Sequence, residues 1–427
     1  MTASWPGSSA ASGSRLVVGG RRGGIWIGTA ALLSAVGSLI AQLAFERALG
    51  VDGFALWAYL LSLIGLLIPV ACMGSNHFVL SEFYAGRLDT RGDAHRVLAY
   101  FGVFTAFALV TFLALNLRGA RSLGLGSLWV AGLLFVAHVP VSLVYSIFLA
   151  RAQTRWVALW PLAQVLMRTA VGCLAILVAW NYETAILAWT LACLTLASVA
   201  TLQVWPSWRS RLGRSASAGA SSWRRMLVPG IGFGLSDLFE ALDLKLLVPL
   251  AALLFAAVET AAAGLAVVVL SAAFFFPHVL ISRILLPAIH RSAEQSDRMA
   301  VRALFLRLCA WSLAVLLPAS ALTYVYGYQL IAFAVKGNYA SQAGALSCLA
   351  FCLAPMCISQ LAAAPHMERK RTWQLLRWRA EAVVLFVLLT MTWRAAGLTA
   401  LLLSFALGRV WLCVRVLSGL RLRANWS

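Results

Sequence analysis

Charged side chains are scarce in this sequence. Only 11% of its 427 residues are Asp, Glu, Lys or Arg, whereas soluble domains carry about a quarter. Hydrophobic residues make up 62% of the chain, and apolar runs long enough to cross a bilayer, which takes about 20 residues, recur from Ile25 to Gly419. The composition therefore excludes an ordinary soluble protein and predicts an all-α polytopic membrane protein.

Acidic residues are the scarcest charged class, with 14 against 34 basic residues and a formal net charge of +20. A large basic excess is often a sign of nucleic-acid binding. Here the basic residues stand in short segments between the apolar runs, and no stretch resembles a soluble basic domain. We therefore expect membrane lipid, and no nucleic acid, as the partner of these charges.

Sequence signals for metal, disulfide and nucleotide chemistry are also missing. The eight cysteines fall in or beside apolar runs, and no His or carboxylate shares the run of Cys348, Cys352 and Cys357. Buried cysteine usually acts as a small hydrophobic residue. The sequence has no glycine-rich loop followed by Lys-Ser or Lys-Thr, which argues against an ATP-driven pump. We expect no cofactor.

The apolar runs predict about twelve transmembrane helices. The expected spans are residues 25–44, 54–74, 97–117, 127–150, 156–179, 185–204, 226–257, 261–286, 304–334, 341–364, 380–393 and 398–417. A long polar segment, residues 205–225, is expected to be a basic cytoplasmic linker. It separates an N-lobe of six helices, residues 25–204, from a C-lobe of six helices, residues 226–418. Residues 1–24 and 419–427 are expected to be cytoplasmic tails, the first of them disordered.

The distribution of basic residues predicts the orientation of these spans. With the N-terminus inside, the cytoplasmic segments hold 26 of the 34 Lys and Arg residues, the external segments hold five and the spans hold three. Short loops rich in Lys and Arg stay on the cytoplasmic side of a membrane. The bias therefore predicts that both chain ends are cytoplasmic.

The seventh span carries an unusual set of charges. Asp237, Glu240, Asp243 and Lys245 all lie within residues 226–257, although one charge at mid-membrane costs about 2.5–3.5 kcal/mol on insertion scales. Steps of three residues place the three acids on one side of a helix. We expect that side to face protein or water rather than lipid.

The same span contains residues that weaken a helix. Gly230, Gly232 and Gly234 lie near its cytoplasmic end, and Pro249 lacks a backbone donor, so that the carbonyl of Lys245 loses its helical partner. Membrane helices tolerate such residues in general. A hinge for a conformational change is the other interpretation, and both stay open.

Two arginines lie near the middle of other spans. Arg168 follows Gln164 by one turn in the fifth span, and Arg409 lies in the twelfth. A guanidinium binds phosphate through a fixed fork of donors, so both arginines are candidates for binding an anion, with Lys245 as a weaker contact. The alternative is an ion pair with an acid of the seventh span, because acids and bases within the spans number three each.

A pattern that starts in the seventh span resembles the polysaccharide flippases. It consists of Asp243, Glu259 to Gly264, Pro287 and Arg291, followed by Gly327 to Ile331 and Lys336 to Tyr339. These flippases transport lipid-linked oligosaccharides and are part of the multidrug/oligosaccharidyl-lipid/polysaccharide exporter (MOP) superfamily. The resemblance implies two six-helix lobes around a central cavity, which opens alternately to the two sides of the bacterial cytoplasmic membrane.

The function implied by the resemblance is the flipping of a polyprenyl-diphosphate-linked oligosaccharide for cell-surface or exopolysaccharide biosynthesis. The substrate-binding candidates are then the buried bases and a polar neighbour, namely Arg168, Arg409, Lys245 and Gln164. The candidates for coupling to a proton or sodium gradient are the acids Asp243, Glu240 and Asp237. A polysaccharide polymerase and a chain-length regulator are the expected protein partners.

Two other functions stay open. A multidrug or metabolite exporter of the same superfamily would differ from a flippase in the charge of its cavity lining, and here acids and bases balance. A membrane polymerase or glycosyltransferase would carry catalytic residues on large external loops, whereas the external connections expected here are all short. We therefore expect a protein that is not an enzyme.

Overall fold

The computed structural model describes residues 20–74, 91–118, 125–150, 154–212, 223–280, 298–335, 339–368 and 372–421. Most of the first predicted tail, the central part of the predicted linker and most of the second tail lie outside the described residues. The same is true of Pro287, Arg291 and residues 336–338 of the flippase-like pattern.

The N-terminal half is formed by α1 (Gly20–Cys72), α3 (Arg91–Arg118), α4 (Leu125–Ala150), α5 (Thr154–Leu177) and α6 (Tyr182–Leu212). Helix α1 contains both the first and the second predicted span, because the only interruption within it is the non-helical residue Gly50, with φ 67° and ψ −177°. Glycine adopts this backbone conformation without the steric cost that a Cβ would bring. The first two spans therefore meet at a sharp bend rather than at a loop.

The C-terminal half comprises α7 (Trp223–Lys245), α8 (Leu247–Leu254), α9 (Ala257–Leu280), α11 (Arg298–Val335), η3 (Ala340–Gln342), α12 (Ala343–Ser347), α13 (Ala350–Glu368), α14 (Thr372–Thr392), η4 (Arg394–Ala396) and α15 (Leu398–Arg421). The seventh predicted span is broken at Leu246 into α7 and α8. Pro249 accounts for the break, because it cannot donate a hydrogen bond to the carbonyl of Lys245.

Within the described residues, each of the twelve predicted spans is matched by a helical segment, and eight helices are long and apolar enough to cross a membrane. The predicted fold class, an all-α polytopic membrane protein of two lobes, is thus confirmed. Helix α14 starts eight residues before the predicted span 380–393, so that Arg377 and Arg379 are part of the helix rather than of a loop before it.

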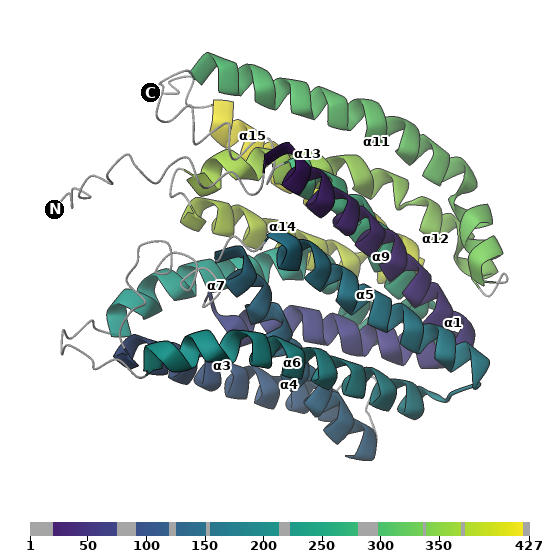
Figure 1. Cartoon of the computed structure of the whole chain (residues 1–427). Coiled ribbons are helices and arrows are strands. Elements are labelled where there is room, and N and C mark those ends of the chain that lie inside the picture. The colour runs from purple at the N-terminus through teal and green to yellow at the C-terminus, as the bar shows by residue number, and fades with distance from the viewer. Residues whose placement is uncertain are drawn as a thin grey trace.

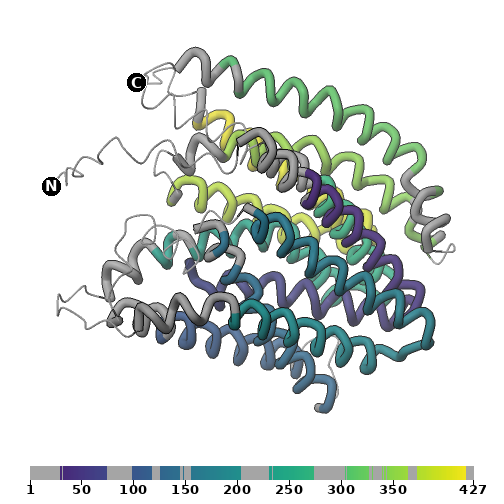
Figure 2. The backbone as a smooth tube through the Cα atoms, viewed as in Figure 1, coloured from purple at the N-terminus to yellow at the C-terminus, as the bar shows by residue number. Residues whose placement is uncertain are grey.

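The helices form two groups that lie side by side (Figure 1). Helix α11 marks one edge of the molecule and packs against α13, which in turn packs against α15, whereas α3, α4 and α6 form the opposite edge. The tube in Figure 2 shows α1 bending back on itself between these groups. Helix α1 packs against α5 of the N-lobe and also against α9 and α7 of the C-lobe. It is therefore the main element through which the lobes meet.

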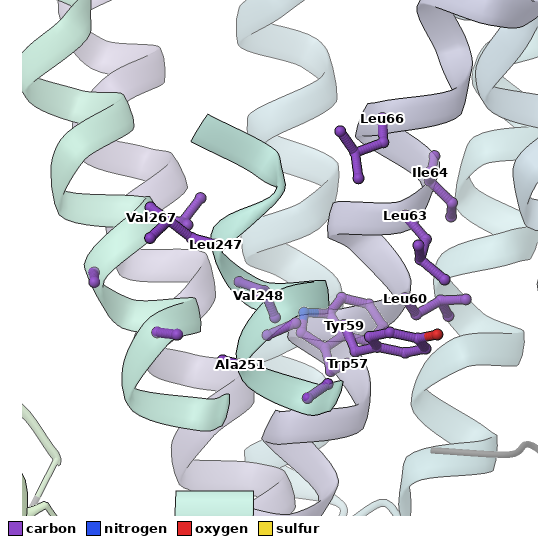
Figure 3. Packing of buried hydrophobic residues seen from close by; sticks show 14 of the residues in the cluster. Trp57, Tyr59, Leu60, Leu63, Ile64, Leu66, Leu247, Val248, Ala251 and Val267 are labelled. Carbon is purple, nitrogen blue, oxygen red and sulfur yellow. The ribbon is translucent and has the colours of Figure 1, made fainter. Parts of the chain in front are cut away.

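The largest apolar cluster lies at this meeting of the lobes. Figure 3 shows Trp57 and Leu60 of α1 together with Val248 and Ala251 of α8 and with Val267 of α9, all of them buried. Trp57 also stacks on Phe45 across the bend of α1, with ring centroids 4.0 Å apart. Apolar burial of this kind, about 25 cal/mol per Å², holds the two lobes together here.

Candidate functional site

Two arginines of the C-lobe neutralise two acids of α7. Nη1 of Arg409, on α15, donates to Oδ2 of Asp243 at 3.0 Å, and the side chains are only 3% and 4% exposed. The guanidinium of Arg409 also lies over the ring of Phe405, with Cζ 5.1 Å from the ring centroid. For Arg409 the sequence left two alternatives, anion binding and an ion pair with an acid of the seventh span. The structure shows the ion pair.

The second pair joins α14 to α7. Nη2 of Arg379 lies 3.2 Å from Oε2 of Glu240, and its Nη1 donates to the backbone carbonyl of Ser236 at 3.0 Å. The Arg379 side chain is 1% exposed, whereas that of Glu240 is 37% exposed. Ser236, Glu240 and Asp243 follow one another at helical spacing, so α14 and α15 hold the same side of α7 through charged contacts.

Arg379 is a site residue that the sequence analysis missed, because it was assigned to a cytoplasmic segment. The spacing of the residues on either side of Arg379 could have indicated that it lies in a helix. Arg377 and Glu381 are four residues apart, on one face of a helix, and their ion pair is 3.0 Å long. Arg379, between them, must point to the other face. Glu381 also accepts a hydrogen bond from Nε of Arg415 at 3.0 Å, which ties α14 to α15.

Arg168 has a different environment, inside the N-lobe. Its Cζ lies 5.0 Å from the ring centroid of Trp189 on α6, a cation–π geometry. His138 of α4 packs edge-on against the same Trp189 ring and donates from Nδ1 to the carbonyl of Leu134 at 2.9 Å. Nε of Arg168 is buried and has no hydrogen-bond partner within the described part of the chain. Gln164, one turn earlier on α5, is half-buried.

Lys245 of the C-lobe lies against α1, the helix that also packs against α5, which carries Arg168. It is the last residue of α7, and its aliphatic stem crosses α1 at Gly65, where an added Cβ would stand 3.3 Å from Cδ of Lys245. Neither cation forms an ion pair with a carboxylate within the described residues.

The charge balance that the sequence left undecided is therefore uneven in space. Glu240 and Asp243 are matched by Arg379 and Arg409 inside the C-lobe. Asp237 is half-buried on α7, one residue beyond the Ser236 contact. The other two cations predicted within spans, Arg168 and Lys245, come from different lobes, on helices that both pack against α1. The arrangement suits an anion, and no three His, Cys, Asp or Glu side chains of the described segments are placed to hold a metal ion.

The chain is similar to known proteins in structure but not detectably in sequence. No protein-family profile matches the chain, and neither does any curated protein sequence. Solved structures do match over nearly the whole chain. An inward-facing multidrug resistance MATE family transporter of the MOP superfamily superposes with a TM-score of 0.63 at 13% identity, covering 94% of this chain and 97% of that one. The chain has the fold of the MOP superfamily transporters.

Two further solved structures are similar to the same degree. The lipid II flippase MurJ, in an inward closed conformation, superposes with a TM-score of 0.64 at 13% identity, covering 93% of this chain and 87% of that one. A MOP superfamily transporter from Pyrococcus furiosus, described as having a binding pocket of reverse polarity, gives 0.59 at 13% identity, with 97% and 98% covered. The MOP fold predicted from the sequence is confirmed. Identities this low do not distinguish the polysaccharide flippases within it.

Proposed function

We propose that this protein is a MOP-type flippase that moves a polyprenyl-diphosphate-linked oligosaccharide across the bacterial cytoplasmic membrane. The observation that carries the proposal is the presence of two cations, Arg168 of the N-lobe and Lys245 of the C-lobe, that have no carboxylate partner among the described residues. The acids nearest to Lys245 in sequence, Asp243 and Glu240, are already paired with Arg409 and Arg379. Both residues are half-buried, and a charge that is partly removed from water without a partner is costly, so a site of this kind favours a ligand that brings the opposite charge.

A pyrophosphate matches the two cations in chemistry. Arg168 can donate two parallel hydrogen bonds to phosphate oxygens from its fixed fork, and Lys245 supplies a compact charge on a flexible stem. Trp189 holds the guanidinium by its ring face, which leaves the edge with the N–H donors available. The lipid tail would remain in the bilayer while the pyrophosphate passes between the lobes.

Coupling to an ion gradient is a second part of the proposal. Asp243 is the best candidate, with Glu240 and Asp237 beside it. Because Asp243 already forms an ion pair with Arg409, a proton suits the coupling role better than a sodium ion. Protonation would neutralise the carboxylate of Asp243 and release Arg409. A polysaccharide polymerase and a chain-length regulator stay proposed partners, and cytoplasmic chain ends stay the predicted topology.

A multidrug or metabolite exporter is the competing function, since MOP neighbours include multidrug transporters. One observation favours it, namely the 37% exposed side chain of Glu240, an acid that a cationic drug could approach. Its ion pair with Arg379 weighs against this reading. The two functions predict opposite substrate charge.

The deciding experiment is transport by the purified protein in proteoliposomes. A fluorescent polyprenyl-diphosphate oligosaccharide and a cationic dye are offered to the wild type, Arg168→Ala and Arg307→Ala, the last removing an exposed arginine as the matched control. We expect glycolipid flipping in the wild type and the control, and loss of most of it in Arg168→Ala. Dye transport without glycolipid flipping would replace the proposal by the exporter function.

A further inference from the structure

Three charged side chains join α14 to α15 on the surface of the C-lobe. The carboxylate of Glu381 lies between two arginines. Its Oε1 accepts a hydrogen bond from Nε of Arg377 at 3.0 Å, and its Oε2 accepts one from Nε of Arg415 at 3.0 Å. Two guanidinium groups thus share one carboxylate, and the three side chains together carry one excess positive charge. We call Arg377, Glu381 and Arg415 the surface triad.

The surface triad faces away from the ion pairs of α7. Arg379 is 1% exposed and contacts Glu240 of α7, whereas Arg377 lies two residues earlier, about 200° away around the same helix, and its side chain is 76% exposed. On α15, Arg409 is 3% exposed, and the side chain of Arg415 is 36% exposed. The surface triad is therefore separate from the buried acids and bases of the candidate site.

The two arginines of the surface triad still have donors to offer. Glu381 takes Nε of both arginines and, at 3.3 Å, Nη2 of Arg415. Both Nη atoms of Arg377 and Nη1 of Arg415 make no hydrogen bond within the described part of the chain. Cζ of Arg415 lies 5.6 Å from the ring centroid of Trp411, which supports one face of the guanidinium. The remaining donors suit the oxygens of a phosphate.

An exposed apolar stripe leads away from the surface triad on each helix. On α14, Val384 and Leu388 follow the triad at helical spacing and are 56% and 58% exposed. On α15, Trp411 and Leu407 precede it at the same spacing and are 40% and 42% exposed. Because α14 and α15 are antiparallel neighbours, both stripes extend to the same side of the triad, over about 10–12 Å at 1.5 Å per residue. That length fits within one leaflet, about half of a 30 Å hydrocarbon core.

We propose that the surface triad binds the headgroup of one anionic phospholipid, of the phosphatidylglycerol type, whose acyl chains lie along the apolar stripes of α14 and α15. The single negative charge of its phosphodiester matches the single excess positive charge of the triad. The start of α14 and the end of α15 lie at the predicted cytoplasmic face, where basic sites between transmembrane helices bind anionic headgroups. This lipid site does not depend on the proposed substrate.

Native mass spectrometry of the purified protein in detergent tests the lipid site. The protein is titrated with phosphatidylglycerol or with phosphatidylcholine of the same chain length, which has no net charge. We expect the wild type to retain one phosphatidylglycerol in preference to phosphatidylcholine. Binding should weaken about fivefold for each arginine lost, and about thirtyfold in Arg377→Gln/Arg415→Gln. Arg155→Gln, which removes an exposed arginine near the start of α5, is the matched control and should bind as the wild type does.

Glu381→Gln separates lipid binding from the packing of α14 against α15. It breaks the same contacts between the helices as the arginine variants do, but it removes no phosphate ligand and deletes the one opposing charge. We expect this variant to bind phosphatidylglycerol at least as tightly as the wild type. A loss as large as that of the double arginine variant would overturn the proposal, because binding would then follow the helix contact rather than the guanidinium groups.

The role of the apolar stripes is tested with glycerol phosphate, which has the phosphate but no acyl chains. We expect it to leave phosphatidylglycerol bound at equal concentration, whereas displacement would mean a site for free phosphate and would overturn the lipid site. Equal retention of the two phospholipids, or full retention by Arg377→Gln/Arg415→Gln, would overturn it as well. No transport is measured in these titrations, so their failure would leave the proposed flippase function standing.

Discussion

Arg409 and Asp243 form a buried ion pair between the last helix of the chain and α7, with 3.0 Å between Nη1 and Oδ2. The two residues are 166 positions apart in sequence. Burial makes the pair interdependent: each charge is tolerated because the other is present. Removing one partner leaves an uncompensated charge, whereas removing both leaves two neutral groups.

The first prediction follows from that interdependence. Arg409→Ala should lower the free energy of unfolding by about 3–5 kcal/mol, and the double variant Arg409→Ala/Asp243→Asn should recover most of the loss. Thermal unfolding of the purified variants in detergent measures both. Arg307→Ala, at an exposed position, is the control for loss of a charge. Additive effects of the two substitutions would mean that the pair contributes nothing to stability.

Arg168 should behave in the opposite way. It has no carboxylate partner in the described chain, so Arg168→Ala should leave the unfolding temperature near that of the wild type while removing most transport per folded molecule. Arg168→Lys keeps the charge but loses the bidentate fork, and should retain part of the transport. A strong fall in stability that Asp243→Asn rescues would show that Arg168 is a structural partner of that acid.

Gly65 offers a test of Lys245 that leaves its charge in place. The stem of Lys245 passes so close to Gly65 that the methyl groups of Gly65→Val must displace it. Transport by Gly65→Val should fall to the level of Lys245→Ala, and adding Gly65→Val to Lys245→Ala should cause little further loss. A double-mutant cycle measures this coupling. If the two substitutions reduced transport independently, the effect of Gly65→Val would not act through the position of Lys245.

Topology is open to a direct check. Single cysteines placed at Ser215 and Ser427, in a background without the other accessible cysteines, should react with an impermeant thiol reagent only after the cells are made permeable. The reason is the strong bias of Lys and Arg towards the segments predicted to be cytoplasmic. Labelling of either position in intact cells would contradict the predicted orientation.

The sequence was sufficient for the helices but not for their charged contacts. Apolar runs located the spans, and Pro249 marked the break that ends α7 at Lys245, because both signals are local. The choice of partner is not local. Arg379 was assigned to a loop because charged residues at the start of α14 interrupt the apolar run from which the span was located. Its contacts with Ser236 and Glu240 depend on how α14 packs against α7.

Arg168 and Lys245 also show that the sequence does not reveal which charged residues pair with each other. Equal numbers of acids and bases within the spans left ion pairing open as an alternative to anion binding, because the count does not say which side chains lie close together. Arg379 and Arg409 pack against acids of α7 within the C-lobe. Arg168 lies in the N-lobe, where its guanidinium packs over the ring of Trp189. A count of charges cannot reveal this separation.

The bend at Gly50 has a consequence for how the protein enters the membrane. Gly50 is the one non-helical residue within α1, so the first two spans are joined without a loop between them. We expect the two spans to leave the translocon together, as a helical hairpin, rather than one after the other. Gly50→Ala, which meets no neighbouring atom but strains the backbone at φ +67°, should therefore slow membrane integration of the hairpin more than it disturbs packing in the finished protein.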